Sequence, residues 1–404
     1  MIAAPPPLTP RPDHVPEELV VDHDYVNLAG MEELGVYRAA KRLHEGPDII
    51  WSPRHGGHWM VTRAEDVKFV QENYEIFSHE EFMIPRVLMP FKPVPLAVDP
   101  PKHARYRAVL NPGFTPSKVA KMRDEARALT IELTEGLKGA GNCEFLSQFA
   151  RIMPVTMFLR IVDLPLDRRE QFVEWGLAIM SAYDPDERRN AQIRVREYLK
   201  AVLDEREGGE GEDLLTRVAG WRGNPRFEND EETLSMATLL FVGGLDTVAS
   251  SLSYIAHYLA QHPEQQQRLR DEPDIIPRAT EEFLRRFGLS NTGRILTRDF
   301  EYKGVHFKKD EMIMVPNNLS GIDERRYPDP FTVDFDRGTT PQDHNTFGNG
   351  PHKCIGAPLA RAEIEVFLQE FVGRMPTFRL DPDRRNVEHC GSVPGFDELY
   401  LRWD

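Results

Sequence analysis

The sequence contains few cysteines and has a deficit of positive charge. Its three cysteines, Cys143, Cys354 and Cys390, lie far apart among 404 residues, too few and too scattered for a disulfide framework or a cysteine-rich zinc site. A reducing cytoplasm suits such a chain. The 50 Lys and Arg residues are outnumbered by 65 Asp and Glu, and the net charge of −15 argues against nucleic-acid binding.

Targeting segments and linkers are also lacking. Met1–Pro16 carries six prolines and no apolar run long enough for a signal peptide or a membrane anchor. We therefore expect a soluble, monomeric, cytoplasmic protein with a poorly ordered leader over residues 1–16. No linker-like stretch or internal repeat divides the remainder, so the sequence predicts one large domain over residues 1–404.

Hydrophobic periodicity predicts a mainly helical fold with a smaller β-sheet region, an α+β class. Helices are expected over Met31–Glu45, Arg63–Tyr74, Lys102–Leu110, Ser117–Leu137, Leu146–Val162, Asp167–Ser181, Glu187–Arg206, Asn229–His262, Pro277–Arg286 and Ala357–Gly373. Strands are expected over Ile49–Ser52, His58–Thr62, Gly293–Pro316 and Pro376–Asp404, the last returning to the sheet.

The longest of these helices, Asn229–His262, would span roughly 50 Å at 1.5 Å per residue. We expect a capping box of Asn229 and Glu232 at its start, and Pro263 ends it. A helix of that length must be a central, buried element.

The segment Phe77–Pro101 holds too many prolines for regular structure, yet apolar residues such as Phe82 and Met83 crowd it. It is either a plain surface loop or the wall of a binding pocket, and its apolar content favours the pocket wall.

The run 347–356, Phe-Gly-Asn-Gly-Pro-His-Lys-Cys-Ile-Gly, places a cysteine in a glycine-rich loop directly before a helix. The glycines let backbone amides turn toward the sulfur of Cys354, and the helix start should lower the pKa of its thiol. The alternative is a buried free cysteine that acts as a small hydrophobic residue.

A second unusual run lies inside the longest helix. Gly243 and Gly244 each cost about 1 kcal/mol in a helix interior relative to alanine. Such a pair lets a flat cofactor or a diatomic molecule approach the backbone, unless it serves close helix packing. Thr247 could bond a carbonyl one turn back and open the helix locally, and Asp246 beside it adds an acid.

The cysteine loop resembles the proximal-ligand signature of the cytochrome P450 family, and the resemblance covers nearly the whole chain from about Met31. It implies the P450 fold, a triangular prism of helices around a buried haem b with the thiolate of Cys354 as axial ligand. It further implies that Thr247 stabilises dioxygen and that Asp246 relays protons from solvent. The residues implied to contact haem or its propionates are His103, Arg107, Gly243, Arg294, Phe347, His352 and Gly356.

Glu282 and Arg285 share one helix face and match the Glu-x-x-Arg of the family. The resemblance implies a structural ion-pair network completed by Arg337, whereas the spacing alone would equally fit an exposed pair.

More closely, the stretches 240–247, 293–297 and 319–325 look like the bacterial camphor-hydroxylase branch. That branch holds its ketone with a tyrosine where this chain has Phe91-Lys92, and Thr292 replaces its usual aspartate near a propionate. The resemblance therefore implies a terpenoid or norisoprenoid substrate, such as an ionone-like ketone. The implied pocket is Met83, Phe91, Leu96, Leu239, Val242, Ser290, Ser392 and Val393.

The resemblance also implies electrons from a [2Fe–2S] ferredoxin and its NADH-dependent ferredoxin reductase. Cations expected over the cysteine side of the haem would steer an acidic ferredoxin. They are Lys102, Arg105, Lys353 and Arg361, with His103, Arg107 and His352 beside them. Two further functions fit the same fold, a peroxide-driven peroxygenase and a non-catalytic haem sensor or carrier.

Overall fold

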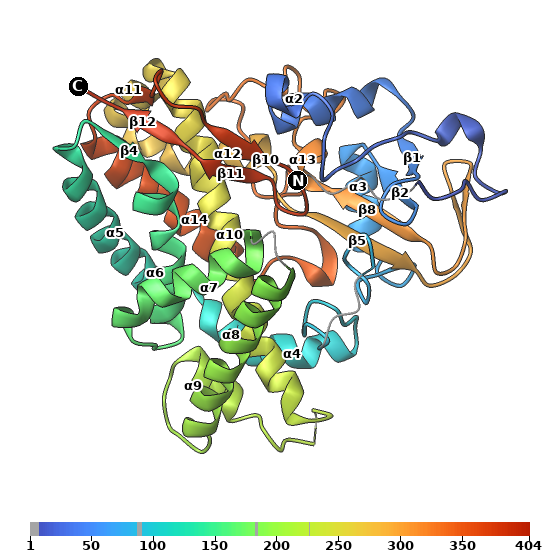
Figure 1. Ribbon diagram of the computed structural model, residues 1–404, viewed down its shortest axis with the longest axis horizontal. Coiled ribbons are helices and arrows are strands. Elements are labelled where there is room, and N and C mark those ends of the chain that lie inside the picture. Colours follow the sequence, from blue (N-terminus) through green and yellow to red (C-terminus); the bar gives the residue numbers. More distant parts are fainter. Residues whose placement is uncertain (1–7, 87–90, 182–184, 226) are drawn as a thin grey trace.

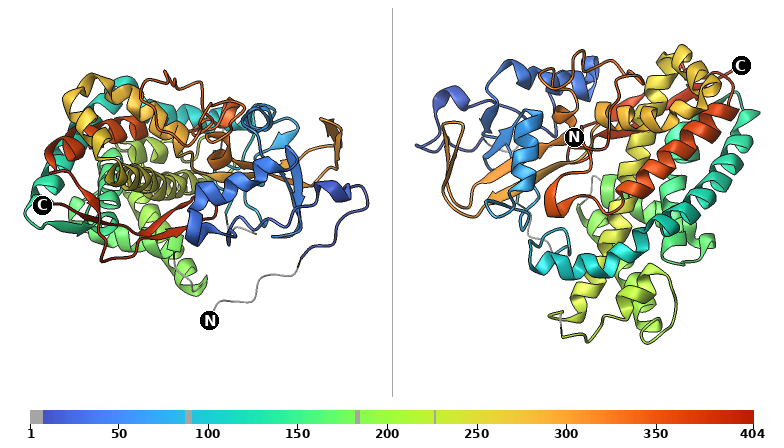
Figure 2. Two further views of the ribbon diagram at one scale, coloured as in Figure 1. Left: turned by 90° about the horizontal axis from the view of Figure 1, so that it is seen from above. Right: turned by 180° about the vertical axis from the view of Figure 1, so that it is seen from behind.

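The computed structural model describes residues 8–86, 91–181, 185–225 and 227–404. Helix α10, Asp230–Gln261, runs through the middle of the molecule (Figure 1), and other elements surround it when the molecule is seen from above (Figure 2, left). More than half of its 32 residues are buried. By length and composition, α10 is the one helix in the described part that could cross a membrane, and its burial is that of a core helix.

Helices pack around α10 on one side, and a β-rich region lies on the other (Figure 1). The other α-helices are α1 Met31–Leu34, α2 Val36–Lys41, α3 Ala64–Glu72, α4 Lys102–Leu110, α5 Pro116–Lys138, α6 Ile152–Ile161, α7 Arg169–Ser181, α8 Pro185–Glu205, α9 Leu214–Ala219, α11 Pro263–Asp271, α12 Ile276–Arg286, α13 Asn317–Ser320 and α14 Ala357–Val366. A π-helical turn precedes α6 at Leu146–Ala150, and another follows α14 at Phe367–Val372.

The main sheet has the strand order β1-β2-β8-β5-β3. Its strands are β1 Ile49–Ser52, β2 His58–Val61, β3 Phe77–Ser78, β5 Asn291–Leu296 and β8 Met312–Pro316. The β1–β2 hairpin is as predicted, and β2 then pairs in parallel with β8. Strands β6 Phe300–Tyr302 and β7 Val305–Phe307 form a separate hairpin.

The C-terminal strands do not return to this sheet, contrary to the sequence-based expectation. Strand β12, Tyr400–Arg402, pairs with β4, Asn142–Glu144, and with β9, Arg379–Leu380. Strands β10, Val387–His389, and β11, Gly395–Glu398, form a hairpin of their own. These small sheets pack on the helical side, because β9 and β11 both contact α10.

The structure contradicts two predictions about helices, one of an unbroken helix and one of a capping box. The expected helix Met31–Glu45 breaks at Gly35, whose φ of 74° is unfavourable for other residues and whose successor Val36 donates its amide to Glu388 Oε2. At α10, Asn229 forms no side-chain cap, and Glu232 Oε2 instead accepts the amide of Glu228, so the predicted capping box is absent.

Part of the predicted leader is ordered. Val15 is fully buried in the sheet-side core, and the amide of Thr9 donates to the carbonyl of Pro53 at 2.8 Å. Residues 8–16 therefore pack on the β1–β2 hairpin. Residues 1–7 lie outside the described part.

Candidate active site

The cysteine loop folds tightly between α3 and α14. Gly348 and Gly350 have φ angles of 71° and 67°, and a Cβ at Gly350 would lie 3.0 Å from the carbonyl oxygen of Gln71. Position 350 requires a positive φ and leaves no room for a Cβ, so only glycine fits there. The amide of Cys354 donates to the carbonyl of Phe347 at 2.8 Å, which closes the loop three residues before α14 begins.

The thiol of Cys354 is enclosed by protein but accessible. Burial raises the pKa of Cys354, and the amides of Gly356 and Ala357 together with nearby Arg107 and Arg361 oppose that rise only in part. The sequence predicted a lowered pKa, which is wrong for the free thiol because desolvation outweighs the helix start. The side chain is nevertheless exposed to solvent, so it faces an open space inside the surrounding protein.

Open space also adjoins the glycine pair of α10. A Cβ built on Gly243 or on Gly244 would meet nothing within 4 Å outside the local helix backbone. Close helix packing therefore does not explain these glycines. Thr247 Oγ1 reaches the carbonyl of Gly243 at 3.4 Å, a long contact that leaves the hydroxyl capable of a second hydrogen bond. The expected local opening is absent, since α10 is continuous here.

Asp246 lies on the same turn of α10. Burial raises the pKa of its carboxyl, while His389 and Arg151 nearby lower it and Asp397 raises it. A carboxyl with a raised pKa takes up and releases protons closer to neutral pH than an ordinary aspartate does.

Three histidines form a cluster beside the cysteine loop. The ring of His352 lies 4.5 Å from that of His79 and 4.6 Å from that of His103, and its Nε2 lies 2.8 Å from Oδ1 of Asp99. Burial and the neighbouring cations lower the pKa of His103 to about 4. Nδ1 of His79 is buried with no hydrogen-bond partner.

Arg294 on β5 points into the same region. It donates hydrogen bonds to Thr292 Oγ1 and to the Gly293 carbonyl, both neutral, and burial lowers its pKa to about 9 against the weaker effect of Asp99. Arg107 donates to the carbonyl of Lys353 at 3.0 Å. A buried guanidinium without a carboxylate partner favours an anionic ligand.

The Glu-x-x-Arg pair forms a buried network. Glu282 and Arg285 are almost completely inaccessible, and Nη2 of Arg285 lies 2.6 Å from Oε1 of Glu282. Arg337 Nε donates to the same oxygen at 3.0 Å, and the Thr339 hydroxyl donates to Oε2 at 2.6 Å. Burial alone would raise the pKa of Glu282, but these donors lower it.

Residues expected to line the substrate pocket come from four segments that hydrogen bonds hold together. The amide of Gly293 donates to the carbonyl of Phe82, the amide of Asn291 donates to the carbonyl of Ser392, and Ser235 Oγ of α10 donates to the carbonyl of Lys92. None of the eight expected lining residues is fully buried, although they lie among core elements: Met83, Phe91, Leu96, Leu239, Val242, Ser290, Ser392 and Val393.

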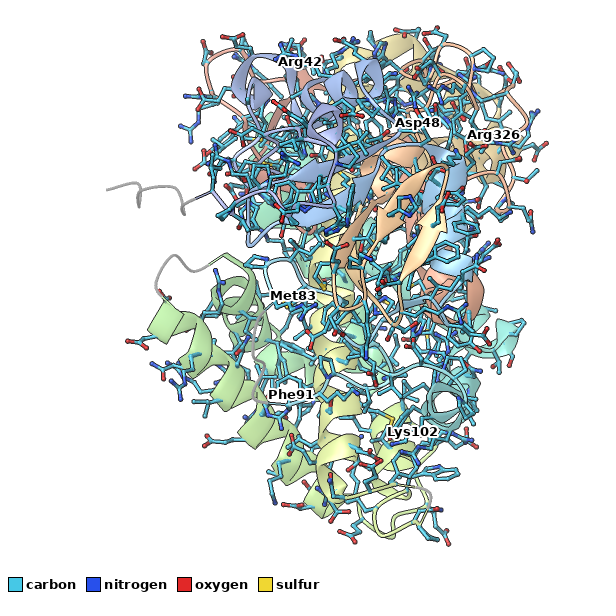
Figure 3. The ribbon with its side chains drawn as sticks, turned by 90° about the vertical axis from the view of Figure 1, so that its right-hand side faces the viewer. Arg42, Asp48, Met83, Phe91, Lys102 and Arg326 are labelled. Carbon is cyan, nitrogen blue, oxygen red and sulfur yellow. The ribbon has the colours of Figure 1, made fainter. Side chains whose placement is uncertain are left out.

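Two of these side chains are labelled in Figure 3, where Met83 lies between the sheet region and the helices below it, and Phe91 lies lower, beside α8. The guanidinium of Arg196 on α8 covers the ring of Phe91 at 4.1 Å. Lys92 points to solvent, since its Nζ contacts the exposed Glu80 at 3.1 Å. Val87, Leu88 and Met89 of this apolar segment lie outside the described residues.

Comparisons with known proteins identify the family. A probable cytochrome P450 127A1 from Sinorhizobium fredii is 32% identical over 404 residues, 98% of this chain and 97% of the relative. This chain belongs to the cytochrome P450 family. The P450 family model matches residues 222–389, and nocardicin C N-oxygenase from Nocardia uniformis subsp. tsuyamanensis is 32% identical over 80% of this chain and 83% of its own length.

The fold agrees. The crystal structure of cytochrome P450 CYP101C1 matches with a TM-score of 0.90 at 33% identity and covers 98% of this chain and all of that one. CYP101J2 matches with a TM-score of 0.88 at 31% identity over 98% of this chain and all of that one. The predicted P450 fold and monooxygenase class are thereby confirmed.

P450 enzymes bind haem through an axial cysteine thiolate, and the residues present here fit that cofactor. The thiol of Cys354 is accessible from inside the protein, and the open side of Gly243 and Gly244 leaves space for a flat ring. The propionate carboxylates of haem suit Arg294, whose hydrogen bonds run to neutral groups, and the unpartnered Nδ1 of His79.

The expected ferredoxin face is only partly free. Lys102 and Arg105 lie close to Glu228, at 2.7 and 3.7 Å, and Arg361 pairs with Glu281 at 2.5 Å. Lys353 is exposed, and no carboxylate of the described residues lies within ion-pair distance of its ammonium.

Sequence reasoning missed several residues around the site. His79 and Asp99 complete the histidine cluster, and His389 and Asp397 act on Asp246. His79, His389 and Asp397 reach the site only through the packing of segments distant in sequence, and no motif marks Asp99, although it lies only four residues before His103. One group of side chains lies close enough together to ligate a metal ion: His44, Asp323 and Glu324. It forms a salt-bridge network instead, since Arg63 binds both carboxylates.

Proposed function

We propose that Cys354 is the axial thiolate and that this haem monooxygenase hydroxylates a small apolar terpenoid or norisoprenoid with electrons from a [2Fe–2S] ferredoxin. One observation carries the assignment. The accessible thiol lies at the start of α14, which packs against α10, and α10 carries the open-sided glycine pair with its acid and alcohol. Haem held there by Cys354 would supply the redox chemistry for the activation of dioxygen.

Asp246 and Thr247 have different roles in proton delivery. The hydroxyl of Thr247 makes only one long bond within the helix, so it can orient dioxygen and pass a proton to it. The carboxyl of Asp246 has a raised pKa and partial access, so it exchanges protons with solvent and with the Thr247 side of the site.

An ionone-like substrate is supported by the character of the lining. The apolar side chains of the expected lining remain partly accessible, and the flexible side chain of Met83 suits substrates with flat or elongated carbon skeletons. Phe91 has no hydroxyl to anchor a camphor carbonyl, a loss of about 0.5–1.5 kcal/mol. Lys92 contacts Glu80 and Ser392 lies within hydrogen-bond reach of the Tyr25 side chain, which leaves Ser290 as the hydroxyl of the expected lining for a ketone.

A small acidic ferredoxin with its NADH-dependent reductase suits the cysteine side. Lys353 follows His352 in the cysteine loop, and Arg107 binds its carbonyl, so two cations adjoin the thiolate on a chain of net charge −15. A local basic patch on an acidic protein steers an acidic partner to one place.

Turnover with NADH, reductase and ferredoxin, compared with turnover on hydrogen peroxide alone, tests the reaction. We expect product with the electron chain and little with peroxide. Efficient peroxide turnover without ferredoxin support would establish the peroxygenase instead. Titrating camphor and β-ionone separately and following the haem spin-state shift tests the substrate class. Near-complete conversion by camphor with little response to β-ionone would overturn the pocket interpretation.

A further inference from the structure

The β10–β11 hairpin brings a histidine to the helix that carries Asp246. His389 ends β10 and pairs with Gly395 of β11. A Cβ at Gly395 would lie 2.7 Å from Oγ of Ser250 and 3.1 Å from Nε2 of His389, so the hydroxyl and the imidazole both lie beside this glycine. Ser250 follows Asp246 by one helical turn, so the two share a face of α10.

The same face of α10 anchors the hairpin. Tyr254, one turn beyond Ser250, donates its hydroxyl to Oε1 of Glu388 at 2.8 Å, and its ring packs against Phe396. The other oxygen of Glu388 accepts the amide of Val36. These contacts hold His389 in a fixed place relative to α10.

His389 links this interior face to solvent. Its Nδ1 lies 3.0 Å from Oδ1 of Asp397, and the side chains of the pair are 31% and 43% accessible. That contact leaves Nε2 on the side of Ser250 and α10. Nδ1 itself is buried, although the side chain as a whole is partly accessible, so Nε2 is the nitrogen through which the imidazole can exchange a proton.

The charges around His389 favour its protonated form. Burial lowers the pKa of the imidazole, but Asp397 and Asp246 raise it by more, and Arg151, which precedes α6, lowers it. Glu388 on its own strand also interacts with it. The net effect raises the pKa of His389 above that of an ordinary histidine, which favours the imidazolium.

We propose that His389, oriented by Asp397, is a proton-relay residue that recharges Asp246 from solvent. Nε2 of the imidazolium gives up its proton toward the carboxylate of Asp246 and takes one up again from water, while Nδ1 keeps its proton toward Asp397. No electron moves in this step. The proposal rests on the proposed role of Asp246 and adds the group that feeds it.

The first test is independent of turnover. Histidine titration by NMR in the diamagnetic reduced carbon monoxide form, with His389→Gln to assign its resonance, measures the pKa directly. Asp246→Asn and Asp397→Asn should each lower the pKa of His389, because each removes a negative charge. An unchanged pKa in Asp246→Asn would overturn the proposal.

The second test measures dioxygen consumption against pH at saturating substrate and reductant. In the wild-type enzyme the rate should fall as pH rises through the pKa of His389. His389→Gln should remove that step and slow consumption at neutral pH by about tenfold, less than the 10²–10⁴ of a direct acid–base group. Substrate affinity and the spectrum of the reduced carbon monoxide adduct should not change.

His257→Gln is the matched control. His257 packs on Phe396 of the same hairpin, but burial alone lowers its pKa to about 4, and it should leave the pH profile unchanged. A wild-type profile in His389→Gln, or equal losses in both variants, would refute the relay. If Asp246→Asn slows consumption while His389→Gln does not, only the relay fails; if Asp246→Asn has no effect, the proposed role of Asp246 fails.

Discussion

Replacing Arg285 by alanine should destroy the folded protein, although this residue touches no part of the proposed pocket. Its side chain is fully buried and pairs with both oxygens of Glu282, at 3.0 and 2.6 Å. It also donates to the carbonyls of Gly321 and Pro330 at 2.6 and 2.7 Å, and to that of Thr332 at 3.0 Å. The substitution therefore strands a buried carboxylate and removes a shared donor from three loop carbonyls.

The magnitude follows from these contacts. Removing one partner of a buried ion pair costs about 3–5 kcal/mol. Arg337 also donates to the carbonyl of Thr332, so two of the three carbonyls, those of Gly321 and Pro330, lose their donor, and each costs about 1–3 kcal/mol. Arg337 and Thr339 still bind Glu282, which offsets part of the first cost. The sum is comparable to the whole stability of a domain, about 5–15 kcal/mol.

Urea unfolding followed by circular dichroism and by loss of haem absorbance measures the effect. Arg285→Ala should yield no folded holoenzyme, and Arg285→Lys should fold with a lowered midpoint, because an ammonium keeps the charge but loses the planar fork. Arg374→Ala is the control, since its pair with Glu370 is at the surface and contributes little to stability. Equal midpoints for Arg285→Ala and Arg374→Ala would refute the reasoning.

Further outcomes follow from the other sites. Thr247→Ala should consume NADH and release hydrogen peroxide in place of product, and Asp246→Asn should slow dioxygen consumption with coupling largely kept; unchanged coupling and rate would contradict this division. Lys353→Glu should slow reduction by ferredoxin, more at low salt than at high, whereas Lys309→Glu, an exposed lysine after β7, should not; equal rates would count against the docking face. Asp24 accepts hydrogen bonds from His55 and from backbone amides, and although burial opposes them they lower its pKa to about 2. The ionised carboxylate stabilises the fold above its unfolded pKa, and this stabilisation is lost as pH falls from about 4 to 2. Asp24→Asn should therefore lower the free energy of unfolding at pH 7 by about 1 kcal/mol after allowance for solvent screening, and by less at pH 3. The same loss at both pH values would contradict this prediction.

The sequence predicts the long helices well, because their apolar periodicity is strong over many turns. Helix α10 begins and ends within one residue of the predicted bounds. The break at Gly35 and the separate C-terminal sheets escaped prediction, since both depend on partners distant in sequence, such as Glu388 for Val36 and β4 for β12. Local patterns carry no information on such partners.

The same distinction between local patterns and distant partners holds for the candidate site. Its motifs identify Cys354, Gly243 and Glu282 from their neighbours in sequence, and in the structure these residues adjoin open space or form the buried pair. The pKa of the cysteine thiol was predicted in the wrong direction, because burial, which sequence does not show, outweighs the helix start. His389 reaches Asp246 only through the packing of a hairpin on α10.

The identity of the axial ligand is the central claim, and the absorption spectrum of the reduced carbon monoxide adduct tests it most directly. A thiolate ligand gives that adduct a strongly red-shifted Soret band. Cys354→His should abolish the shifted band while haem remains bound, whereas Cys143→Ser and Cys390→Ser should retain it, because the first is buried in the core and the second bonds the carbonyl of Val26. Persistence of the red-shifted band in Cys354→His would contradict the account.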